Sequence, residues 1–320
     1  MASKSNITLC KMAARPLFAS RITKVAATSA AASAGFFAYN QYHTRTVYAE
    51  STATATSTMA EPPKTFASGF KFTTLRLHSS EDISADLKKL RFELPEPEAR
   101  SGMKLTSSLA TVIRKPGGIL PIFREYTPIT DPDAPGYIEL VVKKYPNGQL
   151  STHLHSLAPG QTQLFAGPLT RYQWKPSSKQ QEQHVAMIAG GTGICPMYQL
   201  LHGIFKNPAD RTKVTLVWGV NNDAEIFLKD ELDALQRRFP DRLNVVYAVS
   251  NPAPGSTHAK GRVTKELLQR VDLGAPGKVA KMFVCGPPGM EAAVAGSWNF
   301  GSRDGILREL GYTKAQVERL

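Results

Sequence analysis

The spacing of apolar residues changes about halfway along the chain, and this change limits the possible folds more than any other feature of the sequence. Between residues 66 and 175, polar and apolar side chains alternate in short runs that Pro, Gly, Asn and Asp interrupt. A period of two residues indicates strands with one buried face. The clearest runs are residues 71–77, 87–94 and 136–145. Several short strands at this spacing favour an antiparallel β-barrel.

The second half alternates short apolar runs with stretches that have helical spacing. Strands are predicted at residues 184–189, 213–220, 243–249 and 279–285, and helices at residues 196–205, 226–239 and 263–270. This order predicts a parallel sheet with helices on both faces. We therefore expect two domains: an antiparallel β-barrel over residues 66–178 and a Rossmann-like α/β domain with a parallel sheet over residues 179–320.

The first 49 residues differ in composition from the rest of the chain. They hold six basic side chains and no acidic one, and they are rich in Ala, Ser and Thr. This composition is typical of a mitochondrial targeting segment. The apolar run at residues 25–39 is shorter than the roughly 20 residues that span a bilayer, so a cleaved presequence and a membrane anchor both remain open. Residues 50–65 are small and polar, as in a flexible linker.

Charge and cysteine content narrow the possible partners. The formal net charge is +13, of which the first 49 residues supply six. The remaining excess favours an acidic protein partner or an anionic cofactor. Nucleic acid is not expected, because no cluster of Lys and Arg with interleaved aromatic residues is present. The three cysteines, Cys10, Cys195 and Cys285, are too few and too far apart for a zinc site or an iron–sulfur cluster, so no metal is expected.

A glycine-rich turn follows the first predicted strand of the second half. It contains Gly190, Gly191, Thr192 and Gly193, and Pro196 falls in the first turn of the predicted helix. Glycines let the backbone approach a pyrophosphate, and the helix N-terminus offers free N–H groups. Proline stands where the usual dinucleotide fingerprint has its third glycine. Taken alone, the motif also fits an ordinary tight turn.

A second turn strengthens the dinucleotide interpretation. Cys285, Gly286, Pro287 and Met290 follow another predicted strand, 92 residues after Gly193. Parallel strands end at one edge of a sheet, so both turns should border the crevice where such sheets bind ligands. Cys285 is then expected beside a nicotinamide ring, with a buried structural thiol as the alternative.

Two acids, Asp223 and Glu225, follow the predicted strand at residues 213–220. An acidic side chain at this place accepts hydrogen bonds from an adenosine ribose and repels a 2′-phosphate, which favours NADH over NADPH. For Asp223, interaction with a helix dipole is an equal alternative.

In the first half, Arg124, Tyr126 and Thr127 lie beside a predicted strand. Arg pairs with phosphates, Tyr lies against flat rings, and a Thr hydroxyl bonds a ring nitrogen. Gly148 and Ser151 open a predicted short helix whose N–H groups suit a pyrophosphate. A solvent-facing strand is the alternative explanation for the arginine.

Four motifs, R-x-Y-T-P, G-x-x-S, GGTGIxPM and CGPPGM, occur in this order. Together they resemble the NADH–cytochrome b5 reductases of the ferredoxin–NADP reductase superfamily. The resemblance covers roughly residues 66–320. It implies a flavoprotein oxidoreductase that transfers a hydride from NADH to FAD and then single electrons to cytochrome b5 or a similar haem protein. Residues 66–178 would bind FAD, and residues 179–320 would bind NADH.

The basic N-terminus resembles that of the family's mitochondrial members. It implies a protein of the mitochondrion, at the outer membrane, with membrane association through the N-terminus. A cleaved form would lie in the intermembrane space.

The resemblance also implies roles for single residues. Thr127, at flavin N5, and Cys285, at the nicotinamide, are the expected catalytic residues. The expected FAD-binding residues are Arg124, Tyr126, Thr127, Val141, Lys143, Gly148 and Ser151. The expected NADH-binding residues are Gly190, Gly191, Thr192, Gly193, Pro196, Glu225, Gly286, Pro287 and Met290. Among these, Glu225 matches the family's acidic residue that disfavours NADPH.

The sequence departs from the family pattern at two positions of these motifs. Glu125 stands where the family usually has proline, and Cys195 stands where it usually has threonine. Two alternatives therefore remain: a related flavin reductase that serves an iron–sulfur protein or a quinone, and a degenerate flavin-binding module.

Overall fold

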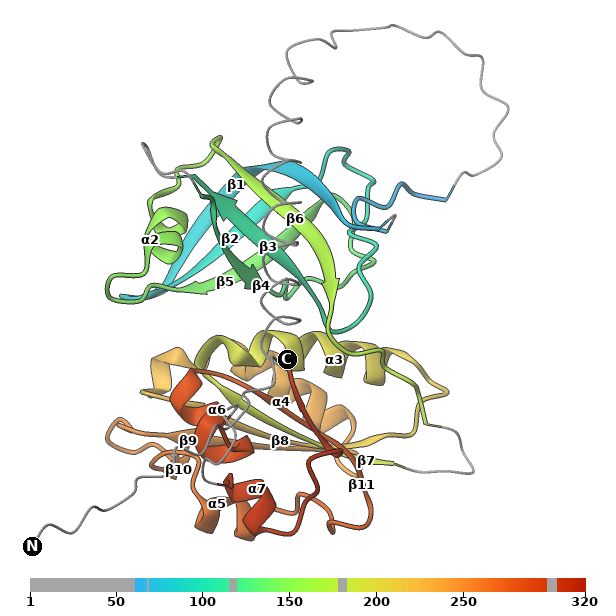
Figure 1. The fold of residues 1–320 in the computed structure, drawn as a ribbon, viewed down its shortest axis with the longest axis vertical. Coiled ribbons are helices and arrows are strands. Elements are labelled where there is room, and N and C mark those ends of the chain that lie inside the picture. The colour runs from blue at the N-terminus through green and yellow to red at the C-terminus, as the bar shows by residue number, and fades with distance from the viewer. Residues whose placement is uncertain (1–60, 68, 115–119, 178–182, 298–303) are drawn as a thin grey trace, which may run out of the picture. The chain divides into compact units, whose positions relative to one another are not determined.

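The computed structural model describes residues 61–67, 69–114, 120–177, 183–297 and 304–320 (Figure 1). The predicted targeting segment and most of the predicted linker lie outside the described residues. The described strands form two six-stranded sheets, one antiparallel and one parallel. The predicted fold class is confirmed.

The antiparallel sheet forms the barrel. Its strands are β1 (Lys71–Ser84), β2 (Leu87–Glu93), β3 (Ser107–Ile113), β4 (Ile122–Tyr126), β5 (Tyr137–Lys143) and β6 (Thr162–Thr170), in the order β4-β3-β6-β1-β2-β5. The edge strands β4 and β5 share no ladder among the described residues, although the N–H of Ile129, just after β4, donates to the carbonyl of Glu139 on β5 at 2.9 Å. Helix α2 (Gln149–Ser156) lies against both edge strands (Figure 1). The sheet is therefore a half-open barrel.

The barrel core comes from alternate residues of these strands. Leu75 and Leu77 on β1 and Leu90 and Phe92 on β2 are fully or almost fully buried. The ring of Phe92 meets that of Phe165 edge to face, with centroids 5.1 Å apart. These residues have the period of two that the sequence shows, which is why this half forms strands.

Strand β1 extends further than the alternation predicts. The prediction ended it at residue 77, but the strand continues to Ser84. Its polar second half pairs with β2, and Glu81 and Asp82 form ion pairs with Lys89 and Lys88 at 2.7 and 3.3 Å. Cross-strand pairing therefore continues the strand through a mostly polar second half.

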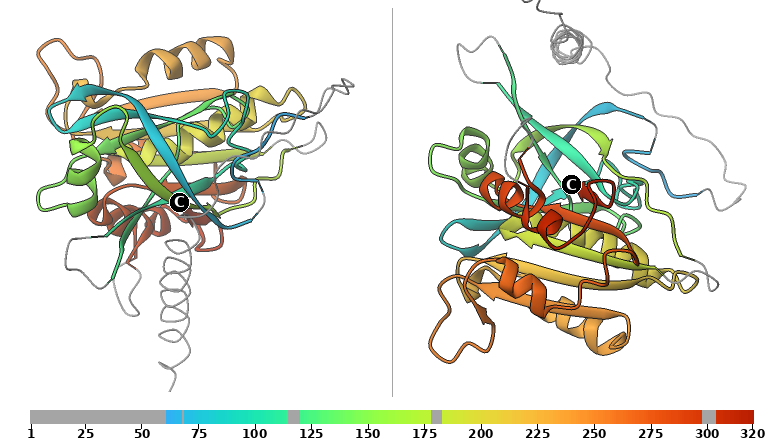
Figure 2. Two further views of the ribbon diagram at one scale, coloured as in Figure 1. Left: turned by 90° about the horizontal axis from the view of Figure 1, so that it is seen from above. Right: turned by 60° about the horizontal axis from the view of Figure 1, so that its bottom comes forward.

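The parallel sheet contains β7 (His184–Gly190), β8 (Lys213–Val220), β9 (Leu243–Val249), β10 (Ala259–Lys260), β11 (Val279–Cys285) and β12 (Val317–Arg319). Their order is β10-β9-β8-β7-β11-β12. Figure 2 shows the same sheet in two further views. Strands β8, β9 and β11 have the predicted bounds. Strand order reverses around β7, so a crevice is expected at the carboxyl edge there.

Helices cover both faces of this sheet. Residues of α3 (Ile194–Lys206) and α4 (Lys229–Arg238) share one hydrophobic cluster. Residues of α5 (Lys265–Arg270), α6 (Pro288–Ala295) and α7 (Ile306–Glu309) share another. Figure 1 shows α3 on the barrel side of the sheet and α5 and α7 on the opposite side. Among the described residues, no helix is both long enough and apolar enough to cross a bilayer.

Two predicted helices begin later than expected. The predicted helix at residues 226–239 is α4 from Lys229, because residues 223–225 form a separate 3-10 turn. The predicted helix at residues 263–270 is α5 from Lys265, because Thr264 caps it: its hydroxyl accepts the N–H of Leu267 at 3.3 Å. A capping side chain lies outside the helix that it stabilises.

Helix α3 contacts the barrel directly at two positions. The Gln199 amide accepts the N–H of Ser107 at 3.1 Å and donates to its carbonyl at 3.3 Å. One helical turn later, a Cβ on Gly203 would lie 2.2 Å from Leu105 Cδ1. The helix that begins at the glycine turn therefore also packs against the barrel.

Candidate functional site

Strand β4 presents the predicted flavin-binding side chains at the barrel edge. Arg124 is exposed, donates to the carbonyl of Phe123 at 2.8 Å and forms no ion pair with an acid of the described residues. Tyr126 is partly buried, and burial, with a smaller effect of Tyr145, raises the pKa of its phenol to about 12. The hydroxyl of Thr127, which is partly buried, makes no hydrogen bond to another described residue. The guanidinium and this hydroxyl are thus available to a ligand.

The turn before α2, residues 145–151, is the FAD-side turn. Gly148 caps α2, no side chain of the described residues caps its first N–H groups, and the first turn of the helix contains no acid. The hydroxyl of Ser151 donates to the carbonyl of Gly148 at 3.2 Å and accepts the N–H of Tyr145 at 3.3 Å. A Cβ on Gly148 would lie 2.5 Å from the Ser151 hydroxyl. Ser151 therefore shapes the turn, and the free N–H groups of the helix suit a phosphate.

Residues 190–193 and 285–290 are the NADH-side turns, and they touch each other. A Cβ on Gly193 would lie 2.2 Å from the carbonyl oxygen of Cys285, and a Cβ on Gly190 would lie 2.5 Å from the sulfur of Met290. A Cβ on Gly286 would lie 3.1 Å from the Cα of Gly190. The two motifs thus meet at the carboxyl edge of β7 and β11, as the sequence predicts.

The first NADH-side turn fits a dinucleotide phosphate. Gly191 has a φ of +52°, and a Cβ built on it would meet no atom within 4 Å. The indole N–H of Trp218, on β8, donates to the carbonyl of Gly191 at 2.9 Å and so fixes the turn. Helix α3 starts without a capping side chain or an acid in its first turn. Open space beside a cap-free helix N-terminus is the environment that a pyrophosphate requires.

The two described cysteines occupy different environments near these turns. Cys195 is 4% exposed inside α3, and burial strongly raises the pKa of its thiol. Cys285 ends β11, where burial and the nearby Glu291 carboxylate raise the pKa of its thiol to about 12. Both thiols are therefore neutral at physiological pH, and Cys285 is suited to contact with a ring rather than to nucleophilic attack.

The negative charge of Glu125, the acid in the R-x-Y-T-P motif, has partners within the protein. Glu125 accepts hydrogen bonds from Ser108 Oγ at 2.8 Å and from Arg171 Nε at 3.2 Å. The charge of Arg171 also lowers the pKa of Cys285 against the effect of burial. Arg171 therefore lies close to both the strand of Tyr126 and the turn of Cys285. Trp174, from the same segment, donates to Asp210 at 3.0 Å and packs against Phe283, at the domain junction.

Sequence reasoning missed Glu291. Its carboxylate accepts the N–H of Gly286 at 3.1 Å and so braces the second NADH-side turn, while burial raises its pKa. Its position directly after the CGPPGM motif was the available signal.

The acids after β8 are engaged within the protein. Asp223 accepts hydrogen bonds from Ser256 Oγ at 2.6 Å and from the N–H of Ala253 at 2.7 Å. Glu225 is 5% exposed and pairs with Lys143 at 2.8 Å. Their roles toward a ribose stay predictions. The other predicted residues divide by exposure: Val141 and Pro196 are buried, Thr192 is partly buried, and Pro287 is exposed.

Comparisons with known proteins agree with this geometry. Residues 74–174 match the oxidoreductase FAD-binding domain, and residues 187–296 match the oxidoreductase NAD-binding domain. A protein of Emericella nidulans named NADH-cytochrome b5 reductase 2 is 45% identical over 84% of this chain and 84% of its own length. A protein of the same name from Pyricularia oryzae is 45% identical over 81% of this chain and 78% of its own length.

Among solved structures, the cytochrome b5 reductase domain of Ulva prolifera nitrate reductase matches with a TM-score of 0.67 and 27% identity, covering 78% of this chain and 97% of that one. The CS-b5R domains of human Ncb5or share the fold, with a TM-score of 0.60 and 20% identity over 79% of this chain and 70% of that one. This chain, with its barrel, its parallel sheet and its paired glycine turns, belongs to the NADH–cytochrome b5 reductase family of the ferredoxin–NADP reductase superfamily.

Proposed function

We propose that the protein is an FAD-dependent oxidoreductase that takes a hydride from NADH and passes electrons singly to cytochrome b5 or a similar haem protein. The contact between Gly193 and Cys285 carries this proposal, because it joins the two motifs expected around one nicotinamide nucleotide. The names of the relatives support the acceptor. The FAD- and NAD-binding domains support the two cofactors.

The protein's own residues bind and align the cofactors. When bound, FAD supplies the redox chemistry, taking up two electrons together and releasing them singly. Arg124 and the free N–H groups of α2 would bind its phosphates, and Tyr126 would lie against its ring. The glycine turn before α3 binds the NADH pyrophosphate. The neutral Cys285 thiol would contact the nicotinamide without blocking hydride transfer, so the protein contributes alignment rather than acid–base chemistry.

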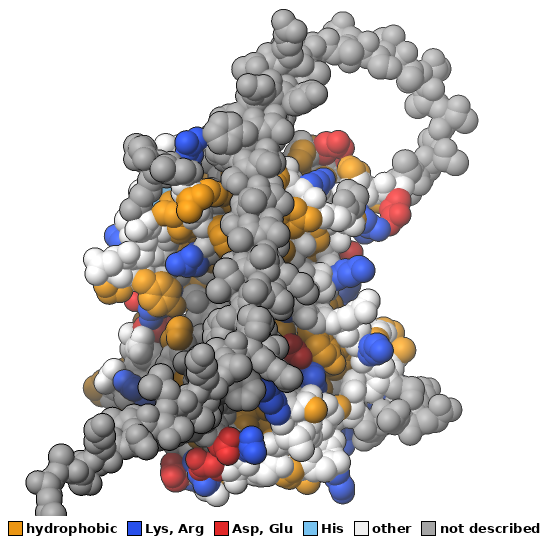
Figure 3. Space-filling view, in the orientation of Figure 1, with side chains coloured by type: hydrophobic (Ala, Val, Ile, Leu, Met, Phe, Trp, Pro, Cys, Tyr) orange, Lys and Arg blue, Asp and Glu red, His pale blue; other side chains and the backbone are white. Residues whose placement is uncertain are grey.

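An acidic haem protein suits the charge of this chain. The excess of basic residues beyond residue 49 favours attraction of an acidic partner. Where Figure 3 leaves the described residues uncovered, lysine and arginine side chains are scattered among acidic ones. We therefore expect the net positive charge of the protein, rather than a local cluster of lysines and arginines on this face, to attract the haem protein.

The proposed location is the mitochondrial outer membrane, with residues 1–49 as the targeting or anchoring segment. Their basic, acid-free composition supports this location. Removal of residues 1–49 should release the protein from membranes and leave its reduction by NADH intact. Loss of that reduction in the truncated protein would show that the segment belongs to the enzyme's fold.

Anaerobic titration tests the reaction. Purified protein should be yellow, NADH should bleach it faster than NADPH does, and oxidised cytochrome b5 should restore the colour while its haem is reduced. A colourless protein that cannot take up FAD would identify a degenerate module. Rapid bleaching without transfer to cytochrome b5, but with transfer to a quinone or an iron–sulfur protein, would identify another acceptor.

A further inference from the structure

One ion pair connects the FAD-binding domain with the NADH-binding domain close to both cofactor turns. Lys143 Nζ lies 2.8 Å from Glu225 Oε1. Lys143 is the last residue of β5 and directly precedes the segment that leads into the FAD-side turn. Glu225 ends the 3-10 turn that follows β8, at the edge of the sheet where the first NADH-side turn lies. The pair thus joins the two halves next to the places where each is expected to hold its cofactor.

The pair is largely shielded from solvent. The side chain of Lys143 is 12% exposed and that of Glu225 is 6% exposed. The amide of Asn221 donates to the same Glu225 oxygen at 3.1 Å, and that of Asn222 lies 3.5 Å from it. Asp86, in the turn between β1 and β2, approaches Lys143 at 3.3 Å. Burial alone would lower the pKa of Lys143, but the carboxylates of Glu225 and Asp86 outweigh it and raise this pKa. The lysine therefore stays charged.

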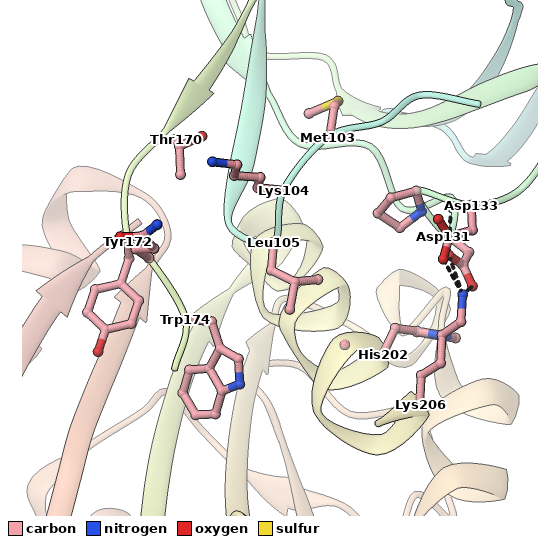
Figure 4. Close-up of a pocket in the computed structure, with 13 residues that line it drawn as sticks. Met103, Lys104, Leu105, Asp131, Asp133, Thr170, Tyr172, Trp174, His202 and Lys206 are labelled. Atoms are coloured by element: carbon pink, nitrogen blue, oxygen red, sulfur yellow. Dashed lines mark hydrogen bonds and ion pairs between the residues drawn. The ribbon is translucent and has the colours of Figure 1, made fainter. Parts of the chain in front are cut away.

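Two further ion pairs between the domains, both made by Lys206, provide a contrast. At the other end of α3, Lys206 pairs with Asp131 at 2.9 Å and with Asp133 at 2.7 Å, beside a pocket of about 390 Å³ (Figure 4). Its side chain is 52% exposed. Lys206 ends the helix that begins at Ile194, so it lies roughly 18 Å along the helix axis from the glycine turn. Exposed pairs of this kind contribute little, whereas removal of one partner of a buried pair leaves an uncompensated charge.

We propose that Lys143 and Glu225 form a latch that holds the NADH-binding domain in register with the FAD-binding domain for hydride transfer. Glu225 acts through Lys143 and not through the ribose of the nucleotide. Both are positioning residues. This inference rests on the proposed function. It also accounts for the burial of Glu225, because a carboxylate that accepts hydrogen bonds from a lysine and two asparagines inside the protein has little surface left for a nucleotide.

A double-mutant cycle tests the latch. The variants are Lys143→Gln, Glu225→Gln and the double variant, with Lys206→Gln as a matched control between the same domains. Anaerobic stopped-flow would follow flavin reduction by NADH and by NADPH at equal FAD content, and thermal unfolding would be measured on the same samples. Each single variant should slow reduction, up to roughly a hundredfold, because small displacements of the reacting groups are costly.

The expected pattern has three parts. The double variant should be no slower than the slower single variant, because neither charge then remains unpaired. The ratio of NADH to NADPH rates should be unchanged in all variants. The Lys206→Gln control should react at the wild-type rate. The melting temperatures should show the same coupling between positions 143 and 225, which is a readout independent of turnover.

Three results would overturn the latch: additive losses, wild-type rates in both single variants, or a change in the NADH to NADPH ratio in Glu225→Gln that is absent from Lys143→Gln. The last result would establish direct discrimination of the nucleotide by Glu225. Failure of the wild-type protein to be reduced by NADH would instead refute the proposed function, and the melting cycle would still decide whether the two positions are coupled.

Discussion

The FAD-side turn and the first NADH-side turn start their helices in the same way but are built differently. Both α2 and α3 begin after a glycine, without a capping side chain or an acid in the first turn. The FAD-side turn is completed within residues 145–151 by the hydroxyl of Ser151. The NADH-side turn is completed by a segment 92 residues later, through the carbonyl of Cys285. The FAD-side turn is therefore formed by neighbouring residues, whereas the first NADH-side turn depends on assembly of the parallel sheet.

This difference decides how each turn tolerates a methyl group. At Gly148 the nearest obstacle is the hydroxyl of a side chain, which another substitution can remove. At Gly193 the nearest obstacles are backbone atoms of Cys285 and Gly286, at 2.2 and 2.5 Å for Cys285 and 2.9 Å for Gly286. Backbone atoms held in a parallel sheet cannot move without disturbing β11. The NADH side should therefore be the more fragile of the two.

Gly193→Ala should have the largest effect. The added methyl must separate the two NADH-side turns, which costs about 1–3 kcal/mol of unfolding free energy through overpacking. Flavin reduction by NADH should slow roughly a hundredfold. FAD content should not change, because the barrel is untouched. Stopped-flow kinetics and flavin absorbance measure the two quantities.

Gly277→Ala is the matched control for this variant. Gly277 lies in the turn before β11, outside both NADH-side turns, and a Cβ there meets no atom within 4 Å. Its rate should stay at the wild-type level. Equal losses in both variants would mean that the contact between the turns does not matter and that the loss has another cause.

Arg124→Ala should have the second-largest effect, and it should be confined to FAD binding. A hydrogen bond to a charged group is worth about 1.5–3 kcal/mol, so the dissociation constant for FAD should rise roughly 10- to 150-fold. The apoprotein should unfold at the wild-type temperature, because Arg124 donates only to the carbonyl of Phe123 within the described residues. Fluorescence titration of apoprotein with FAD gives the constant.

Arg76→Ala provides the control. Arg76 is another exposed barrel arginine, and its Nε donates to Glu93 at 2.8 Å on β2. Its removal should leave FAD affinity unchanged. Weakened FAD binding in this variant would point to a general effect of charge rather than to a phosphate contact of Arg124.

Gly148→Ala should have a smaller effect that a second substitution relieves. The methyl would lie 2.5 Å from the Ser151 hydroxyl and 3.1 Å from the carbonyl of Tyr145. We expect FAD affinity to fall roughly tenfold, which corresponds to about 1.4 kcal/mol. Ser151→Ala in the same chain should recover part of this loss, since the two changes share one contact. If the double variant binds FAD more weakly than Gly148→Ala does, the clash is not the cause.

The sequence predicts local features of this molecule well and its long-range contacts poorly. The bounds of β8, β9 and β11 follow from apolar runs, and the closeness of the two NADH-side turns follows from the rule that parallel strands end at one edge. The ion pair of Lys143 with Glu225 does not follow, because each charge was assigned separately to a ligand. Glu125 with Arg171 is similar: its partner comes from a segment on the far side of β6. Such pairings depend on how segments that are distant in the sequence come together in the fold, which no local period encodes.

The smallest expected effects are on stability at alkaline pH. The NADH-binding and FAD-binding sides should differ in the pH at which the loss of stability begins. The ordinary pKa of a cysteine thiol is 9.0, and that of Cys285 is raised to about 12. The ordinary pKa of a tyrosine is 10.0, and that of Tyr126 is also raised to about 12. A folded-state pKa above the unfolded value stabilises the protein at low pH, and this contribution is lost as pH rises. The loss therefore spans pH 9–12 for the NADH-side thiol and pH 10–12 for the FAD-side phenol.

Cys285→Ala should therefore flatten the decline in melting temperature from pH 9 upward, whereas Tyr126→Phe should flatten it only from pH 10. Between pH 6 and 8 neither group titrates, so neither variant should change the shape of the pH profile of flavin reduction. Melting curves at half-unit steps of pH on both variants measure the onset. A common onset for both variants would mean that one titration elsewhere governs alkaline unfolding. A Cys285→Ala profile that loses a step near neutral pH would mean that this thiol ionises during the reaction, which its burial beside Glu291 argues against.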